Sequence, residues 1–206
     1  GPGQRTVAWF AGCTIRCEGC SNSHLFYGEQ FPAHPVGEIV DQVCQGIALG
    51  DVGISVVGGE PFDQPAALAV MVREVACRWP QCGDIPRIIV YTGYRYEALI
   101  GRQDPALELA LRSVDVLIDG PFVRALANPN LAYRGSSNQR VIDVPATLQC
   151  GAVVTIKDWD TPKIDIHPDG HITLTPALRH LLPPNTSKLP TRHCGQDRPN
   201  NPHTEA

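Results

Sequence analysis

The 206-residue sequence has no run of apolar residues long enough to cross a bilayer, and it shows no secretory signal. It also lacks an excess of positive charge, since 17 Lys and Arg face 21 Asp and Glu and the formal net charge is −4. A protein that binds a nucleic-acid polymer needs a basic face, so that class of partner is disfavoured. These absences predict a protein whose work involves neither a membrane nor a nucleic-acid polymer, and its cysteine usage favours a reducing cytoplasm.

The eight cysteines do not form the framework of a small secreted protein, because they are spread through a mid-sized chain. Three of them, Cys13, Cys17 and Cys20, are bunched in residues 12–22, which read GCTIRCEGCSN. Closed cubane iron–sulfur clusters use four thiolates, so a C-x3-C-x2-C trio leaves one iron without a local ligand. An open metal position is typical of a site of chemistry.

Other functions of this trio stay open from its spacing alone. It could be a zinc knuckle completed by His24 or His34, although zinc ligands more often come in close pairs. It could also belong to an electron carrier with a distant fourth cysteine. Cys77 and Cys82 have C-x4-C spacing but no further ligand nearby, so an auxiliary cluster there is disfavoured. Cys44 and Cys77 fall on apolar helix faces, and we expect both to pack in the core.

Strand and helix patterns alternate along the chain, which predicts an α/β fold with a mainly parallel sheet. A helix is expected to start with Asp63 as N-cap and Pro65 in its first turn, and to end at Pro80. Residues 183–206 contain five prolines and one leucine, and this composition predicts a disordered tail. The other expected elements are strands at 6–11, 54–57, 87–91, 114–118, 140–144 (closed by Pro145) and 152–157, helices at 36–47, 94–100 and 105–112, and a hairpin at 163–175.

Polar and glycine-rich segments follow the predicted strands. In parallel α/β folds, ligands collect at the carboxyl ends of the strands, so these segments should share one rim. Each also has a structural explanation: a plain turn at Gly58-Gly59-Glu60-Pro61, packing at Tyr94, or a helix cap at Asp119. The run RGSSNQR at 134–140 carries many side-chain donors, which suits an anionic or amide-rich ligand.

Taken together, these segments resemble the radical S-adenosylmethionine superfamily and, within it, the activating enzymes of anaerobic (class III) ribonucleotide reductase. The likeness runs from residue 1 to about Val144. The matching stretches are GPGQRT at 1–6, the cysteine loop, GGEP at 58–61, YTGY at 91–94, DVLIDGPF at 115–122 and RGSSNQR at 134–140.

The resemblance implies an incomplete, TIM-like parallel β/α barrel spanning residues 1–182, with a core at 5–157, an extension at 158–182 and the tail at 183–206. It implies that Cys13, Cys17 and Cys20 bind three irons of a [4Fe–4S] cluster, whose free iron takes the amino and carboxylate groups of S-adenosylmethionine. The residues implied to bind this cofactor are Gly58, Gly59, Glu60, Pro61, Thr92, Tyr94 and Asp119.

The implied reaction starts when a flavodoxin- or ferredoxin-type donor reduces the cluster and the cofactor is split into methionine and a 5′-deoxyadenosyl radical. In the family, this radical takes a hydrogen atom from a glycine of the large partner reductase. The chain extends past Val144, so a radical enzyme acting on a small molecule or peptide is an alternative. A non-catalytic iron–sulfur carrier is another. His167 and His171 flank a turn, where an exposed hairpin is favoured over a metal site.

Overall fold

The computed structural model describes residues 1–80, 85–157, 164–166 and 172–174. Its centre is a five-stranded sheet in the order β1-β2-β3-β4-β5. The first four strands run parallel, and β5 runs antiparallel to β4. The strands are β1 (Arg5–Phe10), β2 (Gly53–Gly58), β3 (Ile88–Tyr91), β4 (Val116–Asp119) and β5 (Arg140–Asp143).

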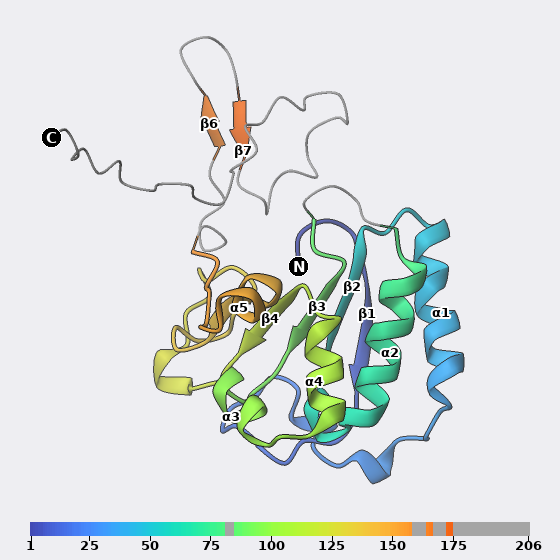
Figure 1. Cartoon of the computed structure of the whole chain (residues 1–206). Helices are drawn as coiled ribbons and strands as arrows, with labels where there is room; N and C mark the ends of the chain where they lie inside the picture. Colours follow the sequence, from blue (N-terminus) through green and yellow to red (C-terminus); the bar gives the residue numbers. More distant parts are fainter. Residues whose placement is uncertain (81–84, 158–163, 167–171, 175–206) are drawn as a thin grey trace, which may run out of the picture.

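Helices connect the parallel strands, as such strands require. Figure 1 shows α1 (Val36–Ala48), α2 (Pro65–Arg78) and α4 (Pro105–Arg112) side by side on one face of the sheet. Within the described ranges, no helix has the length and apolar character needed to span a membrane. The shorter elements are 3-10 helices η1 (Ser23–Leu25), η2 (Gly28–Gln30), η3 (Pro61–Asp63) and η4 (Arg124–Leu126), helices α3 (Tyr96–Gly101) and α5 (Val144–Cys150), and strands β6 (Ile164–Ile166) and β7 (Ile172–Leu174).

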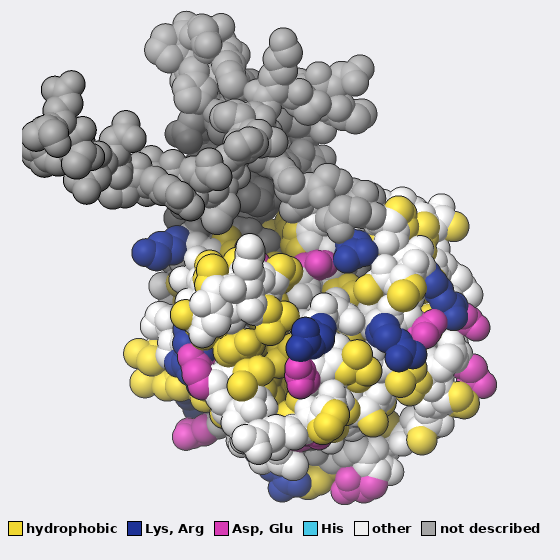
Figure 2. All heavy atoms as spheres, viewed as in Figure 1, with side chains coloured by type: hydrophobic (Ala, Val, Ile, Leu, Met, Phe, Trp, Pro, Cys, Tyr) yellow, Lys and Arg dark blue, Asp and Glu magenta, His cyan; other side chains and the backbone are white. Residues whose placement is uncertain are grey.

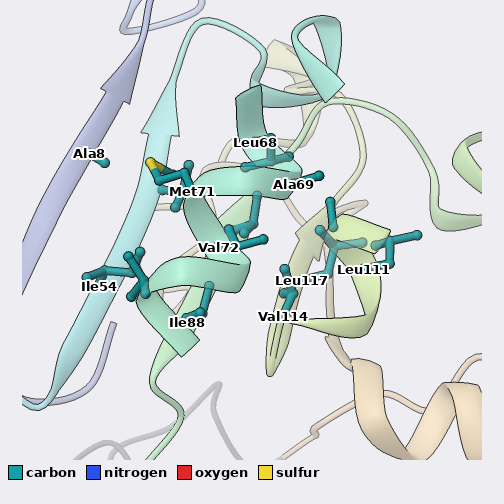
Figure 3. Close-up of a cluster of buried hydrophobic side chains, with 14 of the residues drawn as sticks. Ala8, Ile54, Leu68, Ala69, Met71, Val72, Ile88, Leu111, Val114 and Leu117 are labelled. Carbon is teal, nitrogen blue, oxygen red and sulfur yellow. The ribbon is translucent and has the colours of Figure 1, made fainter. Parts of the chain in front are cut away.

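The two faces of the sheet bury different side chains because successive residues of a strand point to opposite sides. On the helix side, Ile54 and Ile88 pack against Met71 and Val72 of α2, and these side chains interdigitate between helix and sheet in Figure 3. The other face carries a smaller cluster. That cluster consists of Ile89, Val116, Ile118 and Val141, with Tyr91, Tyr133 and Ile156 against it.

A sheet covered by helices on one face only agrees with the expected incomplete barrel. On the exposed surface of the helix side, charged side chains of both signs are scattered among neutral and apolar ones (Figure 2). Val7 and Trp9 of edge strand β1 are 45% and 56% exposed, and their side chains belong to the sheet face opposite the helices. The open face therefore presents apolar side chains beside the carboxyl ends of the strands.

Most predicted elements are confirmed, and three details were wrong. Helix α2 begins at Pro65 with Gln64 as its N-cap residue, so Asp63 is not the cap. Helix α5 begins at Val144 with Pro145 in its first turn, so Pro145 does not simply close a strand, and the Asp143 carboxylate accepts the Ala146 N–H as a cap. Residues 152–157 contribute one isolated bridge, from Thr155 to Ile142, in place of a sixth strand.

Cys44 packs against the core as expected, whereas Cys77 is exposed, contrary to the prediction. The apolar side of α2 turns away from Cys77 because Val72 and Val75 define the buried stripe. The expected hairpin is confirmed in its two strands, since β6 and β7 pair antiparallel. The turn of this hairpin, with His167 and His171, lies outside the described residues. Cys82 and the tail at 183–206 lie outside them as well.

Candidate functional site

The loops at the carboxyl ends of the strands enclose a cavity of about 470 Å³. All three clustered cysteines line it, so the trio faces one shared space. Gly58, Gly59, Glu60, Thr92 and Gly93 line it as well. From the open face of the sheet, the cavity also takes Val7, Trp9, Ser55, Val57 and Tyr91. A larger hollow of about 820 Å³ between β1 and α1 contains none of the residues predicted to bind the cluster or S-adenosylmethionine. His34, considered above as a zinc ligand, lines this hollow and does not line the cysteine cavity.

The cysteine loop is held in place by its own backbone. Gly12 N–H donates to Leu25 O at 2.7 Å, and Cys13 N–H donates to Phe26 O at 3.1 Å. Arg16 has a left-handed φ of 48°. Its guanidinium donates to Cys13 O at 3.3 Å and stacks on the Tyr27 ring at 4.7 Å. The loop is thus folded back on itself, with the three half-buried thiols on its cavity side.

N–H groups reach two of the three sulfurs. Burial raises the pKa of the Cys13 thiol, while the N–H groups of Arg16 and Ile15 act in the opposite direction. Burial likewise raises the pKa of the Cys17 thiol, and the N–H of Phe122 opposes it. Such donors stabilise thiolates, which are the form that binds metal. Phe122 belongs to the DGPF segment after β4, so a distant part of the chain contacts the cysteine loop.

The paired glycines Gly58 and Gly59, at the end of β2, are required by the close approach of two loops. Gly59 N–H donates to Phe10 O and Glu60 N–H donates to Gly12 O, each at 2.7 Å. A Cβ on Gly59 would lie 2.1 Å from Gly12 O, and Gly58 has a φ of +123°. Larger residues would push the β2 loop away from the cysteine loop. The run is therefore more than a plain turn.

Glu60 is 1% exposed and holds two loops together. Its Oε1 accepts the Phe62 N–H at 2.9 Å and the Thr92 hydroxyl at 2.8 Å. Its Oε2 accepts the Gly93 N–H at 2.8 Å. Burial raises the pKa of Glu60 to about 7, and the hydrogen bonds from Phe62, Gly93 and Thr92 act against that rise. A carboxylate oxygen has two acceptor sites, so Oε2 retains capacity for another donor.

Three residues predicted to bind cofactor are not among the residues that line the cavity: Pro61, Tyr94 and Asp119. Pro61 is buried at the start of η3. The Tyr94 hydroxyl donates to Asp63 Oδ1 at 2.7 Å. Contact of these residues with a cofactor remains a prediction, while the structure shows each in a supporting position.

Asp119 is fully buried. It accepts the Tyr96 N–H at 2.8 Å, which caps α3, and it pairs with the Arg140 guanidinium. Arg140 also binds Glu97, and this contact is the main reason why the pKa of Glu97 falls to about 2. The sequence shows both Asp119 and Arg140, but their pairing depends on β5 running antiparallel beside β4.

The donors of the RGSSNQR run mostly bind this chain's own backbone. Asn138 Nδ2 donates to Pro121 O at 2.8 Å, and Gln139 Nε2 donates to Gly120 O at 3.0 Å. The Ser136 hydroxyl accepts the Val123 N–H at 3.2 Å. The sequence predicted an anionic or amide-rich ligand for these donors. In the structure they bind the backbone of the segment that contains Phe122. Gly135 and Gln139 still reach the cavity wall.

The donor chemistry of the cavity fits an iron–sulfur cluster. Three thiols share it, and N–H groups point at two of their sulfurs. Across the described residues, no three His, Cys, Asp or Glu side chains are grouped to hold a single metal ion. In a cubane cluster, by contrast, each thiolate binds a different iron. Cys13, Cys17 and Cys20 are the residues that would hold it.

Comparisons with known proteins indicate an iron–sulfur domain. A family model described as a 4Fe-4S single cluster domain matches residues 1–142. The anaerobic ribonucleoside-triphosphate reductase-activating protein of Vibrio cholerae is 32% identical over 142 residues, which cover 68% of this chain and 87% of the relative. The proteins of the same name from Escherichia coli K12 and from phage T4 are each 32% identical, over 68% of this chain and 89% and 85% of the relatives. No solved structure matches the chain significantly.

The match covers the cysteine loop, the paired glycines and the DGPF segment within one continuous region. It also covers most of each relative's length, so the likeness is to whole proteins. The chain belongs to the 4Fe-4S single cluster domain family and is a radical S-adenosylmethionine-type enzyme of the glycyl-radical-activating group.

Proposed function

We propose that this protein binds S-adenosylmethionine beside a [4Fe–4S] cluster and uses its reductive cleavage to place a glycyl radical on an anaerobic ribonucleotide reductase. One observation carries the proposal: the three cysteines and the Glu60 carboxylate face the same cavity of about 470 Å³. When bound, the cluster supplies the electron that splits the cofactor into methionine and a 5′-deoxyadenosyl radical. The reductase as protein substrate is also supported by the relatives, which are anaerobic ribonucleoside-triphosphate reductase-activating proteins.

Glu60 and the paired glycines form the proposed cofactor-binding wall. An ammonium group placed near Oε2 of Glu60 would gain a charge-assisted hydrogen bond in a water-poor site. The Thr92 hydroxyl and the Gly93 N–H keep the carboxylate in one orientation. Pro61 helps to fix η3, and Thr92, Tyr94 and Asp119 are the proposed contacts for ribose and adenine.

The open face of the sheet is the proposed entrance for the protein substrate. Val7 and Trp9 are exposed there and border the cavity, so a peptide loop can approach the site beside β1. A fully closed barrel would leave no such approach. We further propose a cytoplasmic location and a flavodoxin- or ferredoxin-type donor, because thiolate ligands need a reducing compartment.

Anaerobic incubation of the reconstituted, reduced protein with S-adenosylmethionine tests the chemistry. We expect 5′-deoxyadenosine to form, and its absence from a protein with full iron content would refute the proposed cleavage. Adding the large reductase subunit from the same organism tests the substrate, since a glycyl radical should then appear by electron paramagnetic resonance. Nucleoside formation without that radical would contradict the reductase assignment and favour a small-molecule or peptide substrate.

A further inference from the structure

Three loops meet at the carboxylate of Asp63, on the outer side of the cysteine loop. Asp63 Oδ2 accepts the Thr14 backbone N–H at 2.7 Å. Asp63 Oδ1 is 3.1 Å from the Thr14 hydroxyl and 2.7 Å from the Tyr94 hydroxyl. The two hydroxyls are 2.8 Å apart. We call this group of Thr14, Asp63 and Tyr94 the clasp.

The clasp joins segments that are remote in sequence. Thr14 lies in the loop after β1, Asp63 ends η3 after β2, and Tyr94 follows β3. The Arg102 guanidinium lies over the Tyr94 ring at 3.9 Å, which fixes the ring from its other side. Both oxygens of Asp63 are occupied by groups outside its own element. Asp63 is thus engaged in tertiary contacts, in keeping with the finding that it does not cap α2.

The clasp acts on Cys13 through the peptide bond that follows it. Thr14 is the next residue, so the Thr14 N–H bond to Asp63 fixes the Cys13–Thr14 peptide. The preceding peptide is fixed by the Cys13 N–H bond to Phe26 O. Arg16 binds the Cys13 carbonyl. With the peptides on both sides held, the Cys13 side chain leaves the backbone in one direction, toward the cavity.

We propose that Asp63 is a positioning residue of the cluster site, which presents the Cys13 sulfur to iron by holding Thr14 and Tyr94. The inference rests on the proposed function only in placing the cluster at the three cysteines. Asp63 acts through Thr14 and does not itself bind iron. Residues that orient metal ligands in this way commonly contribute 10- to 100-fold in metal affinity or activity. Loss of the clasp should therefore speed the release of cluster iron about tenfold.

Variants of Asp63 can separate its hydrogen bonds from its negative charge. In Asp63→Asn the amide oxygen can still accept the Thr14 N–H, and the amide nitrogen can donate to a hydroxyl. In Asp63→Ala no acceptor remains. A positioning role therefore predicts a graded series, with the Asn variant nearer to the parent protein than the Ala variant. The variants Thr14→Val and Tyr94→Phe each remove one hydroxyl and should fall between parent and Asp63→Ala.

The test measures iron release from anaerobically reconstituted protein into an excess of a chelator, with the electron paramagnetic resonance spectrum of the reduced cluster recorded beside it. We expect Asp63→Ala to release iron about tenfold faster than the parent, and Asp63→Asn to lie between them. Asp41→Asn is the matched surface control, because Asp41 pairs with Arg78 on the helix side. Its release rate should equal that of the parent.

A second control separates positioning from general loss of stability. Ile142→Val removes one buried methyl group of the core, far along the chain from the clasp, and should lower the melting temperature without changing the iron-release rate. The proposal is overturned if Ile142→Val releases iron as fast as Asp63→Ala, or if Asp63→Ala retains iron like the parent. Cofactor cleavage by the parent protein is measured separately. Failure there would refute the proposed function and leave the iron-release result standing.

Discussion

Replacing Glu60 with Gln gives the sharpest test of the cofactor-binding wall. The side chain keeps its shape but loses its charge. If the amide oxygen replaces Oε1, it still accepts the Phe62 N–H and the Thr92 hydroxyl. The amide nitrogen then faces the Gly93 N–H, which donated to Oε2 at 2.8 Å in the parent. Two donors cannot bond to each other, so one buried N–H loses its partner.

Two magnitudes follow from this geometry. An unsatisfied buried donor costs about 1–3 kcal/mol, so the free energy of unfolding should fall by up to that amount. The lost charge also removes a hydrogen bond to the cofactor ammonium, which is worth about 1.5–3 kcal/mol. At about 1.4 kcal/mol per tenfold, S-adenosylmethionine affinity should drop by about 10- to 100-fold. Iron content should stay unchanged because no thiol is altered.

The assay is anaerobic titration of S-adenosylmethionine into cluster-loaded protein, with iron counted in each sample. Glu108→Gln is the matched control, since Glu108 is an exposed partner of Arg112 on α4 and should bind cofactor like the parent. An affinity for Glu60→Gln within twofold of the parent would refute the pairing of Glu60 with the ammonium. A parallel loss of iron would show instead that Glu60 serves the cysteine loop.

Three further outcomes can be measured. Cofactor affinity should rise between about pH 6 and about pH 7.5, because the raised pKa of Glu60, about 7, leaves the carboxyl neutral below that pH and ionised above it; a flat titration curve would contradict this. Cys17→Ala should lose the cluster and all cofactor cleavage, whereas Cys77→Ala, at an exposed position of α2, should keep both. Equal loss of iron in the two variants would show that the cluster does not bind at the three clustered cysteines. Arg140→Met should lower the free energy of unfolding by about 3 kcal/mol, because it removes the main ion-pair partner of the fully buried Asp119 carboxylate. Chemical denaturation measures this change, and a loss below about 1 kcal/mol would show that Arg95 suffices as the partner of Asp119.

Local patterns in the sequence were enough to locate most strands and helices. The buried strands are short apolar runs that end at glycine or polar residues, and α1 has the helical spacing of Val40, Val43 and Ile47. Helix α5 was missed because Pro145 was interpreted as a stop, although proline is equally favourable in a first helical turn. The antiparallel direction of β5 carries no local signal. It depends on which strand edge the chain returns to.

The candidate site divides in the same way. The cysteine spacing predicted a shared ligand set, and the structure places all three thiols on one cavity. Asp63 was interpreted as a helix cap because aspartate before proline is a common helix start. Its partners, Thr14 and Tyr94, lie too far away in the sequence for any local pattern to reveal them. Asp63 stands three residues after Glu60, and that proximity to the paired glycines was the one available hint.

The amino-acid sequence by itself determined which functional groups are present: three thiols at cluster spacing, glycines that allow two loops to touch, and a carboxylate beside them. The tertiary structure decided what each polar group binds, because a hydrogen bond forms only when folding brings donor and acceptor within about 3 Å. Thus the side chains of Asn138 and Gln139 donate hydrogen bonds to backbone carbonyls of this chain. Glu60, by contrast, lines the cavity. Composition and spacing define the available ligands, and the packing of loops on a half-covered sheet selects those that face the substrate.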